Sequence, residues 1–470
     1  MTTALIFLPL AGALVVALLP LPRRLTEGLA LLVALAECGL GAAALIGFNA
    51  NGGQQYVENR DWISDFGLNT SIRYHVSMDG LSLFMVLLAA VGIAAAAGAA
   101  IRMGRERPRA YFALLLVLEF ALVLLFTAQD LVLFYVGWEI MMIPLYVLMG
   151  VWGGAGRRAA TIQFVVYTLI GSLLMLVAIA TLGVTAGTFE LPALVASPHE
   201  SAWLFLAFAA AFCIKAPLFP LHGWLPSAYR ESSPEVAALL SGVVSKAGAY
   251  GLLRFAVPLF PKTAHDWRWL LLGLALAGLL YGSLVAFRQP DARGVVAYSS
   301  LAQMNLIIIG IFAFNTNGST GAIFQMVNHG VVSLAAFLLI GLVETRTGTD
   351  LFAYLGGLAN SRPIASTVFL IAALWALAVP GSSVFVSELY ILIGAYQQAA
   401  LLGAAAALGI VLAAMYMLRW YSALAHLDDG ERVPEGMPDL LLGELAIAVP
   451  LILILLALTA YPFGVMERIS

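Results

Sequence analysis

Several ionisable side chains lie inside apolar stretches of this sequence, where a charge would face lipid or a dry protein interior. They are Glu37, Glu119, Glu139, Lys215, Lys246, Arg254, His329, Glu388 and Glu444. A charge at the centre of a bilayer costs roughly 2.5–3.5 kcal/mol even on a permissive insertion scale, so each such residue needs a reason to be there. The chemistry that these residue types offer is the uptake and release of protons.

One acid and one amine form the clearest candidate pair. Glu139 lies within residues 134–144 and Lys215 within residues 212–220, each as a single charge among apolar neighbours. Loss of water disfavours the charged form of both side chains, and a close partner of opposite charge favours it. A lysine whose charge depends on the position of its partner can act as a switchable proton carrier. The alternative is a static buried ion pair that fixes helix packing.

Three further residues could extend a proton path. Lys246 has small neighbours that leave room for water, and it could take a proton from Lys215; the alternative is a lysine that extends to the interface. His329 titrates near neutrality and could relay protons, although a hydrogen-bonded packing role suits one membrane histidine equally well. Glu388 follows a Pro380-Gly381 break and could be the last protonatable group before the outer side.

The remaining buried charges carry weaker signals. Glu119 lies eight residues before the expected end of its helix, which predicts a position near the middle of the membrane. Arg254 is nearer the outer end of its helix and is predicted to extend its guanidinium toward water. Glu37 and Glu444 have no neighbouring motif and receive no role.

Composition places these residues in a membrane protein. Of the 470 residues, 62% are hydrophobic and 10% are charged, whereas soluble domains carry about 25% charged residues. The net charge of −3 says nothing about nucleic-acid binding, but the sequence has no Lys/Arg patch of the kind that binds phosphate, so no nucleic-acid partner is expected. Cys38 and Cys213 lie in apolar runs and are expected to be free buried thiols. No residue spacing suits a metal, an iron–sulfur cluster or a phosphate-binding loop, so no cofactor is expected in this chain.

Apolar runs of membrane-spanning length predict fourteen helices. They cover residues 3–20, 27–48, 79–101, 110–127, 129–151, 162–184, 202–220, 234–256, 268–287, 295–314, 318–342, 364–398, 400–424 and 441–462. The first run is interpreted as a membrane helix and not as a signal peptide. Connections on one side hold 15 Lys and Arg residues and those on the other hold 5. This bias predicts that the first side is cytoplasmic and that both termini are outside.

The predicted fold is therefore all-α, a polytopic protein with a single membrane domain over residues 1–470. Prolines interrupt spans seven and twelve, and each break has a charged residue beside it. Paired broken helices are typical of inverted repeats with an ion path at the midplane. We expect helices 1–3 in residues 1–101, a first five-helix repeat in 110–256, a second in 268–424, and helix 14 in 441–470.

The motifs around these residues resemble those of the antiporter-like, proton-conducting membrane subunits of respiratory complex I, and the M type most closely. The matching segments run from about residue 78 to 420 and include residues 78–82, 138–154, 215–234, 297–300 and 380–388. The resemblance implies that Glu139 and Lys215 form a glutamate–lysine switch and that Lys246 is the connecting lysine. It also implies that His329 belongs to a central hydrophilic axis and that Glu388 is the exit residue.

The resemblance further implies a setting for the chain. It would be a translocase subunit of NADH:quinone oxidoreductase in a bacterial inner membrane, beside neighbouring antiporter-like subunits. FMN, iron–sulfur clusters, NADH and quinone would be bound by the partner subunits. One departure concerns the path: where the family usually has a histidine, this chain has Gln303. Glutamine cannot titrate, so the relay between Lys246 and Glu388 must use water, His329 or a different route.

A second departure is Arg293, a single basic residue where the family usually has two adjacent ones; we expect it to affect the cytoplasmic loop more than the path. Two other classes of function remain open. One is a multisubunit cation/proton antiporter or a related hydrogenase-, ferredoxin- or deazaflavin-linked complex, which would share the fold and the Glu–Lys pair; Pro144 and Glu388 favour complex I. The other is a purely structural membrane subunit, against which the run of mid-membrane charges argues.

Overall fold

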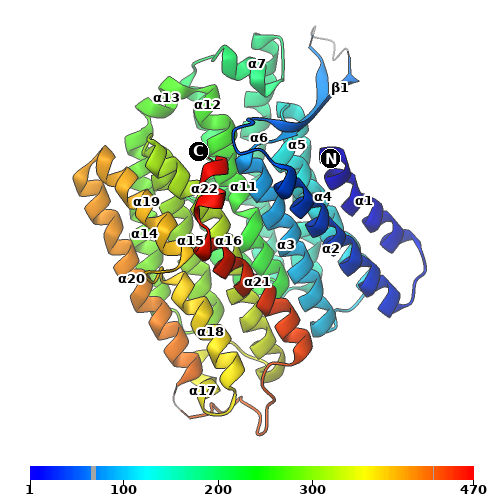
Figure 1. Cartoon of the computed structure of the whole chain (residues 1–470), viewed down its shortest axis with the longest axis vertical. Coiled ribbons are helices and arrows are strands. Elements are labelled where there is room, and N and C mark those ends of the chain that lie inside the picture. Colours follow the sequence, from blue (N-terminus) through cyan, green and yellow to red (C-terminus); the bar gives the residue numbers. More distant parts are fainter. Residues whose placement is uncertain (65–69, 427, 470) are drawn as a thin grey trace.

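The long apolar runs become long helices, because a segment in lipid must satisfy its backbone hydrogen bonds internally. The computed structural model describes residues 1–64, 70–426 and 428–469. Most helices stand side by side as one bundle, and smaller helices and a hairpin cover one end (Figure 1). The bundle therefore has the architecture that the sequence predicts.

The first part of the chain carries two strands and the helices up to the middle of the sequence. In order they are α1 (Thr2–Leu18), α2 (Arg23–Gly47), β1 (Gln55–Ile63), β2 (Ile72–Met78), α3 (Gly80–Met103), α4 (Pro108–Thr127), α5 (Leu131–Trp152), α6 (Arg157–Ala186), α7 (Leu191–Ala196), α8 (Ala202–Lys215), α9 (Leu225–Glu231), α10 (Pro234–Leu239), η1 (Leu240–Val244), α11 (Lys246–Gly251), η2 (Leu252–Ala256), α12 (Val257–Leu259) and α13 (Pro261–Asp266).

The second part is entirely helical in the residues described. Its helices are α14 (Arg268–Arg288), α15 (Ala292–Phe312), α16 (Thr316–Thr347), η3 (Phe352–Tyr354), α17 (Leu358–Ser361), α18 (Pro363–Ala376), α19 (Ser383–Gln398), α20 (Ala400–Ala425), α21 (Leu442–Ala460) and α22 (Phe463–Ile469).

The helices account for the predicted spans. In the described ranges, 11 helices are long and apolar enough to cross a membrane, and shorter apolar helices at α1, α8 and α18 supply the remaining spans. Two helices run further than expected: α6 has 30 residues and α16 has 32. The division into two inverted repeats stays a prediction.

The two predicted helix breaks are present. Helix α8 ends at Lys215, and α9 begins only at Leu225. Helix α18 ends at Ala376 and α19 begins at Ser383, with the backbone between them turning through a positive φ of 97° at Gly381. The span that carries Lys246 was predicted as one regular helix, but two π-helical segments, η1 and η2, interrupt it. Such bulges frequently mark functional sites.

One element was not predicted at all. The hydrophilic stretch before α3 forms an antiparallel hairpin in which β1 pairs with β2 and Asn59 lies opposite His75. It covers the same end of the bundle as α7 and α13 (Figure 1). The fold thus remains a helical membrane protein with a small extramembrane cap.

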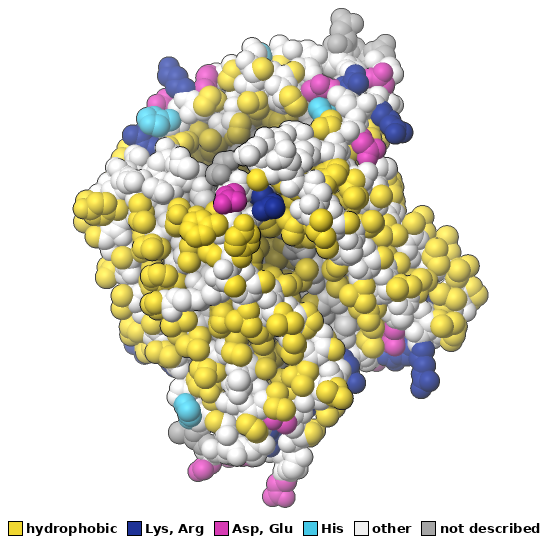
Figure 2. All heavy atoms as spheres, viewed as in Figure 1, with side chains coloured by type: hydrophobic (Ala, Val, Ile, Leu, Met, Phe, Trp, Pro, Cys, Tyr) yellow, Lys and Arg dark blue, Asp and Glu magenta, His cyan; other side chains and the backbone are white. Residues whose placement is uncertain are grey.

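Burial separates central helices from peripheral ones. The most apolar window is completely buried in α16 and 94% buried in α15, but only 28% buried in α21. Hydrophobic side chains cover the broad middle of the outer surface, and charged side chains gather at its two ends (Figure 2). This distribution fits a bilayer around the bundle and places the polar residues of α15 and α16 far from lipid.

Candidate functional site

Glu139 projects from the middle of α5 toward α6. The helix begins after Asp130, whose side chain accepts hydrogen bonds from the backbone N–H groups of Val132 and Leu133 at 2.9 and 3.1 Å. The half-buried Glu139 carboxylate accepts a hydrogen bond from the Ser172 hydroxyl on α6. It also lines a cavity of about 370 Å³ between these two helices. A half-buried acid beside a cavity can exchange protons with water that enters it.

Lys215 is the last residue of α8 and is completely buried. Its amine donates to the Met142 sulfur at 3.1 Å and lies 4.9 Å from the centre of the Phe164 ring. A polarisable sulfur and an aromatic face are weak partners for an ammonium group in a dry site. The charge of Lys215 is therefore poorly stabilised where the amine lies.

The predicted close contact between Glu139 and Lys215 is not made in this structure. No ion pair joins them among the described residues, although the carboxylate does exert a Coulombic attraction on the amine. Met142 links the two sites, because it touches Lys215 and lines the same cavity as Glu139. The geometry corresponds to an open arrangement of the pair.

Lys246 and His329 are brought into direct contact from α11 and α16. The amine lies 2.8 Å from the His329 Nδ1 atom and donates to the Ser241 carbonyl at 2.5 Å. The other ring nitrogen of His329 lies 3.0 Å from the Ser333 hydroxyl. Because two adjacent cations in a dry interior repel each other, this contact allows at most one positive charge on the lysine and histidine together.

No direct hydrogen bond joins Lys215 to Lys246 in the part of the chain that the structure describes. The two helices nevertheless pack tightly where Gly248 of α11 meets α8. A Cβ atom at this glycine would come within 2.5 Å of the Ala216 nitrogen. Proton transfer between the lysines therefore needs water or side-chain movement over a short interhelical distance.

Glu388 ends a buried cluster of amides. The Gln303 side-chain amide donates to Glu388 Oε1 at 2.9 Å, and the Gln325 amide donates to Gln303 Oε1 at 2.8 Å. The Ser387 hydroxyl in turn donates to Gln325 Oε1 at 2.6 Å. The second carboxylate oxygen, Oε2, has no hydrogen-bond partner in the described ranges. The acid is held in position by neutral groups and not by a cation.

A small cavity joins the histidine to this cluster. It measures about 20 Å³, and Gln303, Gln325, His329 and Ser333 contribute to its wall. A cavity of about 10–15 Å³ with several polar partners can hold one water molecule. The position where the family usually has a histidine thus faces both Glu388 and a water-sized space beside His329.

The other buried charges lie outside the group of residues from Lys246 to Glu388. Glu119 is fully buried, and neither carboxylate oxygen has a hydrogen-bond partner in the residues described. Glu444 forms an ion pair with Arg346 at 2.5 Å. Arg254 lies near the outer end of its span, as expected. Its partly buried guanidinium forms an ion pair with Asp79 at 2.5 Å, and both side chains line a cavity of about 510 Å³ at that end of the bundle.

The sequence analysis did not single out four residues that contact the candidate side chains or line their cavities: Met142, Ser172, Gln325 and Ser333. The sequence did contain a signal for Gln325 and Ser333. Gln325, His329 and Ser333 recur every four residues along α16, which places them on one face of the helix. Ser172 gave no such signal, because a lone serine in a membrane helix commonly bonds its own backbone. Both cysteines are free, and no metal-binding group of three or more His, Cys, Asp or Glu occurs in the described residues.

Comparison with known proteins identifies the family to which the chain belongs. Residues 128–415 match the family model described as "NADH:quinone oxidoreductase/Mrp antiporter, TM". The chain is 35% identical to NADH-quinone oxidoreductase subunit M of Rhodobacter capsulatus, over 99% of this chain and 94% of that one. It is 34% identical to NADH-ubiquinone oxidoreductase chain 4 of Marchantia polymorpha, over 98% of this chain and 93% of that one.

Solved structures agree. A chain of respiratory complex I from Thermus thermophilus with bound NADH superposes with a TM-score of 0.90 at 32% identity, covering 100% of this chain and 98% of that one. The Mrp complex from Dietzia has a chain with the same fold, with a TM-score of 0.88 at 24% identity, covering 99% of this chain and 96% of that one. The chain belongs to the NADH:quinone oxidoreductase/Mrp antiporter transmembrane family.

Proposed function

We propose that this chain is the M-type, proton-translocating membrane subunit of an NADH:quinone oxidoreductase, complex I. The relatives that match it nearly end to end bear the names of complex I subunits. The observation that carries the proposal is the buried polar line from Lys246 through His329 and a water-sized cavity to Gln303 and Glu388. A purely structural subunit would not need buried polar side chains arranged in this way.

In the proposed mechanism, Glu139 and Lys215 set the charge at one end of this line. When Glu139 moves toward Lys215, it stabilises the ammonium form; when it returns to Ser172, the amine loses that support and releases its proton. Lys246 and His329 accept the proton through water and share the charge. Water in the small cavity carries it past Gln303 to Glu388, which releases it to the outer side.

The redox reaction belongs to other subunits in this proposal. FMN, iron–sulfur clusters, NADH and quinone would be bound there, and neighbouring antiporter-like subunits would flank this chain in the bilayer. The complex would lie in a bacterial inner membrane, with both termini of this chain outside.

The test uses the assembled complex in vesicles with either Glu139→Gln or Lys215→Ala. We expect assembly to persist and coupled proton pumping and quinone reductase activity to fall by about 10-fold or more, which corresponds to at least about 1.4 kcal/mol of added barrier. Glu27→Gln is the matched control, because Glu27 lies near the start of α2 and pairs there with Arg23 at 2.7 Å. Wild-type pumping in both variants would remove their assigned roles.

A cation/proton antiporter subunit is the second candidate, because the Dietzia Mrp chain shares the fold. The subunits that co-purify with this chain distinguish the two. Flavin and iron–sulfur subunits support complex I, whereas other membrane subunits alone support an antiporter.

A further inference from the structure

Two buried acids, Glu37 on α2 and Glu119 on α4, lie outside the line just described. Both side chains are completely inaccessible to solvent. All four of their carboxylate oxygens lack hydrogen-bond partners in the part of the chain that the structure describes. An isolated carboxylate in such surroundings is strongly disfavoured, so these two groups require an explanation.

Glu37 and Glu119 lie on neighbouring helices, α2 and α4. Helix α2 packs against α1, α3 and α4. Gly41, one turn after Glu37, brings α2 close to α3, since a Cβ atom there would lie 2.9 Å from a Leu87 methyl carbon. The two carboxyl groups are near enough for their charges, if both were ionised, to repel each other, and the Cys38 thiol lies near both.

No cation compensates the two acids. No Lys, Arg or His contributes to the electrostatic surroundings of either carboxyl group among the described residues. Helix α1 has no titratable side chain, and α3 has only Arg102 at its inner end. The nearest acid on α5 is Glu139, which Ser172 holds toward α6. Two neighbouring carboxylates without a counter-charge cannot both be ionised at acceptable cost.

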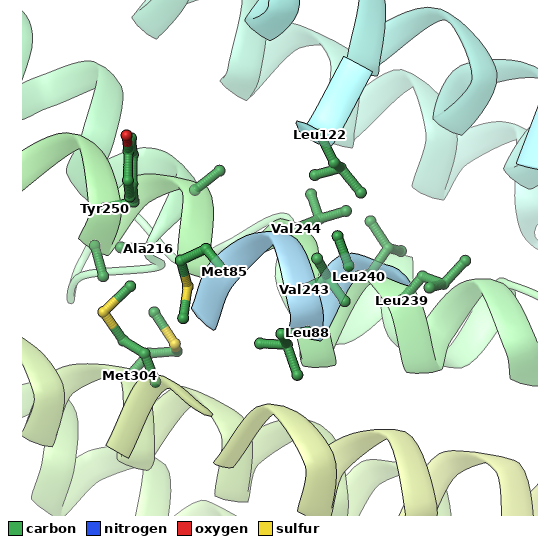
Figure 3. Packing of buried hydrophobic residues seen from close by; sticks show 14 of the residues in the cluster. Met85, Leu88, Leu122, Ala216, Leu239, Leu240, Val243, Val244, Tyr250 and Met304 are labelled. Atoms are coloured by element: carbon green, nitrogen blue, oxygen red, sulfur yellow. The ribbon is translucent and has the colours of Figure 1, made fainter. Parts of the chain in front are cut away.

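An apolar layer separates α4 from the helix that carries Lys246. Leu122, three residues after Glu119, points toward Val244 of η1, and Leu240 and Val243 extend the same layer (Figure 3). Met85 and Leu88 of α3 lie beside η1, and Leu88 points toward α16 (Figure 3). Among the described residues, the hydrogen bonds of Lys246 go to Ser241, Ser245 and His329, and none goes to Glu37 or Glu119.

We propose that Glu37 and Glu119 form a proton-binding pair between α2 and α4 that is separate from the Lys246–Glu388 line. At least one of the two carboxyl groups binds a proton at neutral pH, and this neutral form is what allows the two acids to lie near each other in the membrane. The ligand is the proton itself, and binding it changes no other bond.

Infrared difference spectroscopy of the purified complex tests this proposal. The carbonyl stretch of a protonated carboxylic acid, shifted in D₂O, is expected in the wild-type complex at neutral pH and is expected to be lost in the Glu37→Gln, Glu119→Gln double variant. In each single variant the remaining acid loses its repelling neighbour, so its band is expected to move or disappear. Glu27→Gln, an acid on the same α2 that is paired with Arg23, leaves the spectrum unchanged.

Two results would overturn the proposal. One is a double variant whose protonated-acid bands equal those of the wild type. The other is a band that Na⁺ abolishes and K⁺ does not, which would make the pair a cation site. If the double variant fails to assemble, the single variants still decide the matter: unchanged bands in both contradict a coupled, protonated pair.

Discussion

At the scale of single residues, Gln303 decides how this chain departs from its relatives. It is the strongest hydrogen-bond donor to Glu388, at 2.9 Å, and the Gln325 amide lies further from the same oxygen, at 3.5 Å. Glutamine donates and accepts but does not titrate. It can therefore orient the acid and a water molecule beside His329 in the proposed path.

Replacing Gln303 by leucine tests this role. The variant leaves a buried acid without its main donor, and a hydrogen bond to a charged group contributes about 1.5–3 kcal/mol. We predict that pumping falls by about 10- to 100-fold, whereas Gln303→His, which restores a donor that can also titrate, retains most of it. The exposed Gln397→Leu on the same α19 as Glu388 is the control. Full pumping in Gln303→Leu would show that Glu388 does not depend on this amide.

At the scale of secondary-structure elements, the sequence predicts what proline and apolar length control. The sequence predicts both helix breaks, because proline removes a backbone hydrogen-bond donor. The charged residues beside the breaks indicate that these sites have a function. The sequence does not predict the π-helical segments around Lys246. Each differs from an α-helix only in that its hydrogen bonds span one more residue, and no residue type requires this. The hairpin was missed because β1, with sequence QYVENRDWI, lacks the alternation of apolar and polar residues that marks a strand.

The start of α3 gives an element-scale prediction with a pH dependence. Burial raises the pKa of Asp79, but the Arg254 guanidinium and the Ser82 backbone N–H outweigh burial, and the net pKa lies below its ordinary value. A lowered acid pKa contributes stability above the unfolded-state pKa of about 3.9, and that stability is lost as pH falls through the folded-state pKa.

We therefore predict that Asp79→Asn, which still caps the helix, lowers stability at neutral pH by about 1.5–3 kcal/mol because Arg254 loses its charged hydrogen-bond partner. The difference in thermal midpoint between wild type and variant should shrink as the pH falls below about 4 toward the lowered folded-state pKa of Asp79. The measurement is thermal unfolding of the purified complex between pH 7 and pH 3. A difference independent of pH would contradict the assigned ion pair.

At the scale of the whole molecule, the central helices hold the polar line and the peripheral ones face lipid. The sequence identifies Lys246, His329 and Glu388 as separate candidates, and only the fold shows that α11 and α16 bring Lys246 and His329 within 2.8 Å. The open arrangement of Glu139 and Lys215 could not be predicted, because side-chain positions in a switch depend on its state. Glu37 gave no signal in the sequence, since its only meaningful neighbour is more than eighty residues away in the chain.

The distribution of basic residues makes a prediction about orientation. Because Lys and Arg concentrate on the side of the connection after α1, that side is expected in the cytoplasm. A cysteine placed at Asn51, in the exposed segment before β1, should react with a membrane-impermeant thiol reagent added to intact cells. A cysteine at Glu435, in the segment before α21, should react only after the cells are opened. The reverse pattern would invert the topology and the proposed direction of proton release.

The most direct test of the proton path is the replacement of Lys246 by methionine, which keeps the side-chain length and removes the charge. We predict that vesicles containing the assembled variant complex translocate about tenfold fewer protons per NADH oxidised, or that coupled oxidation slows to the same extent, since the barrier rises by at least about 1.4 kcal/mol. The exposed Lys262→Met on α13 should pump like the wild type. Wild-type proton yield and rate in the Lys246→Met complex would contradict a path through this residue.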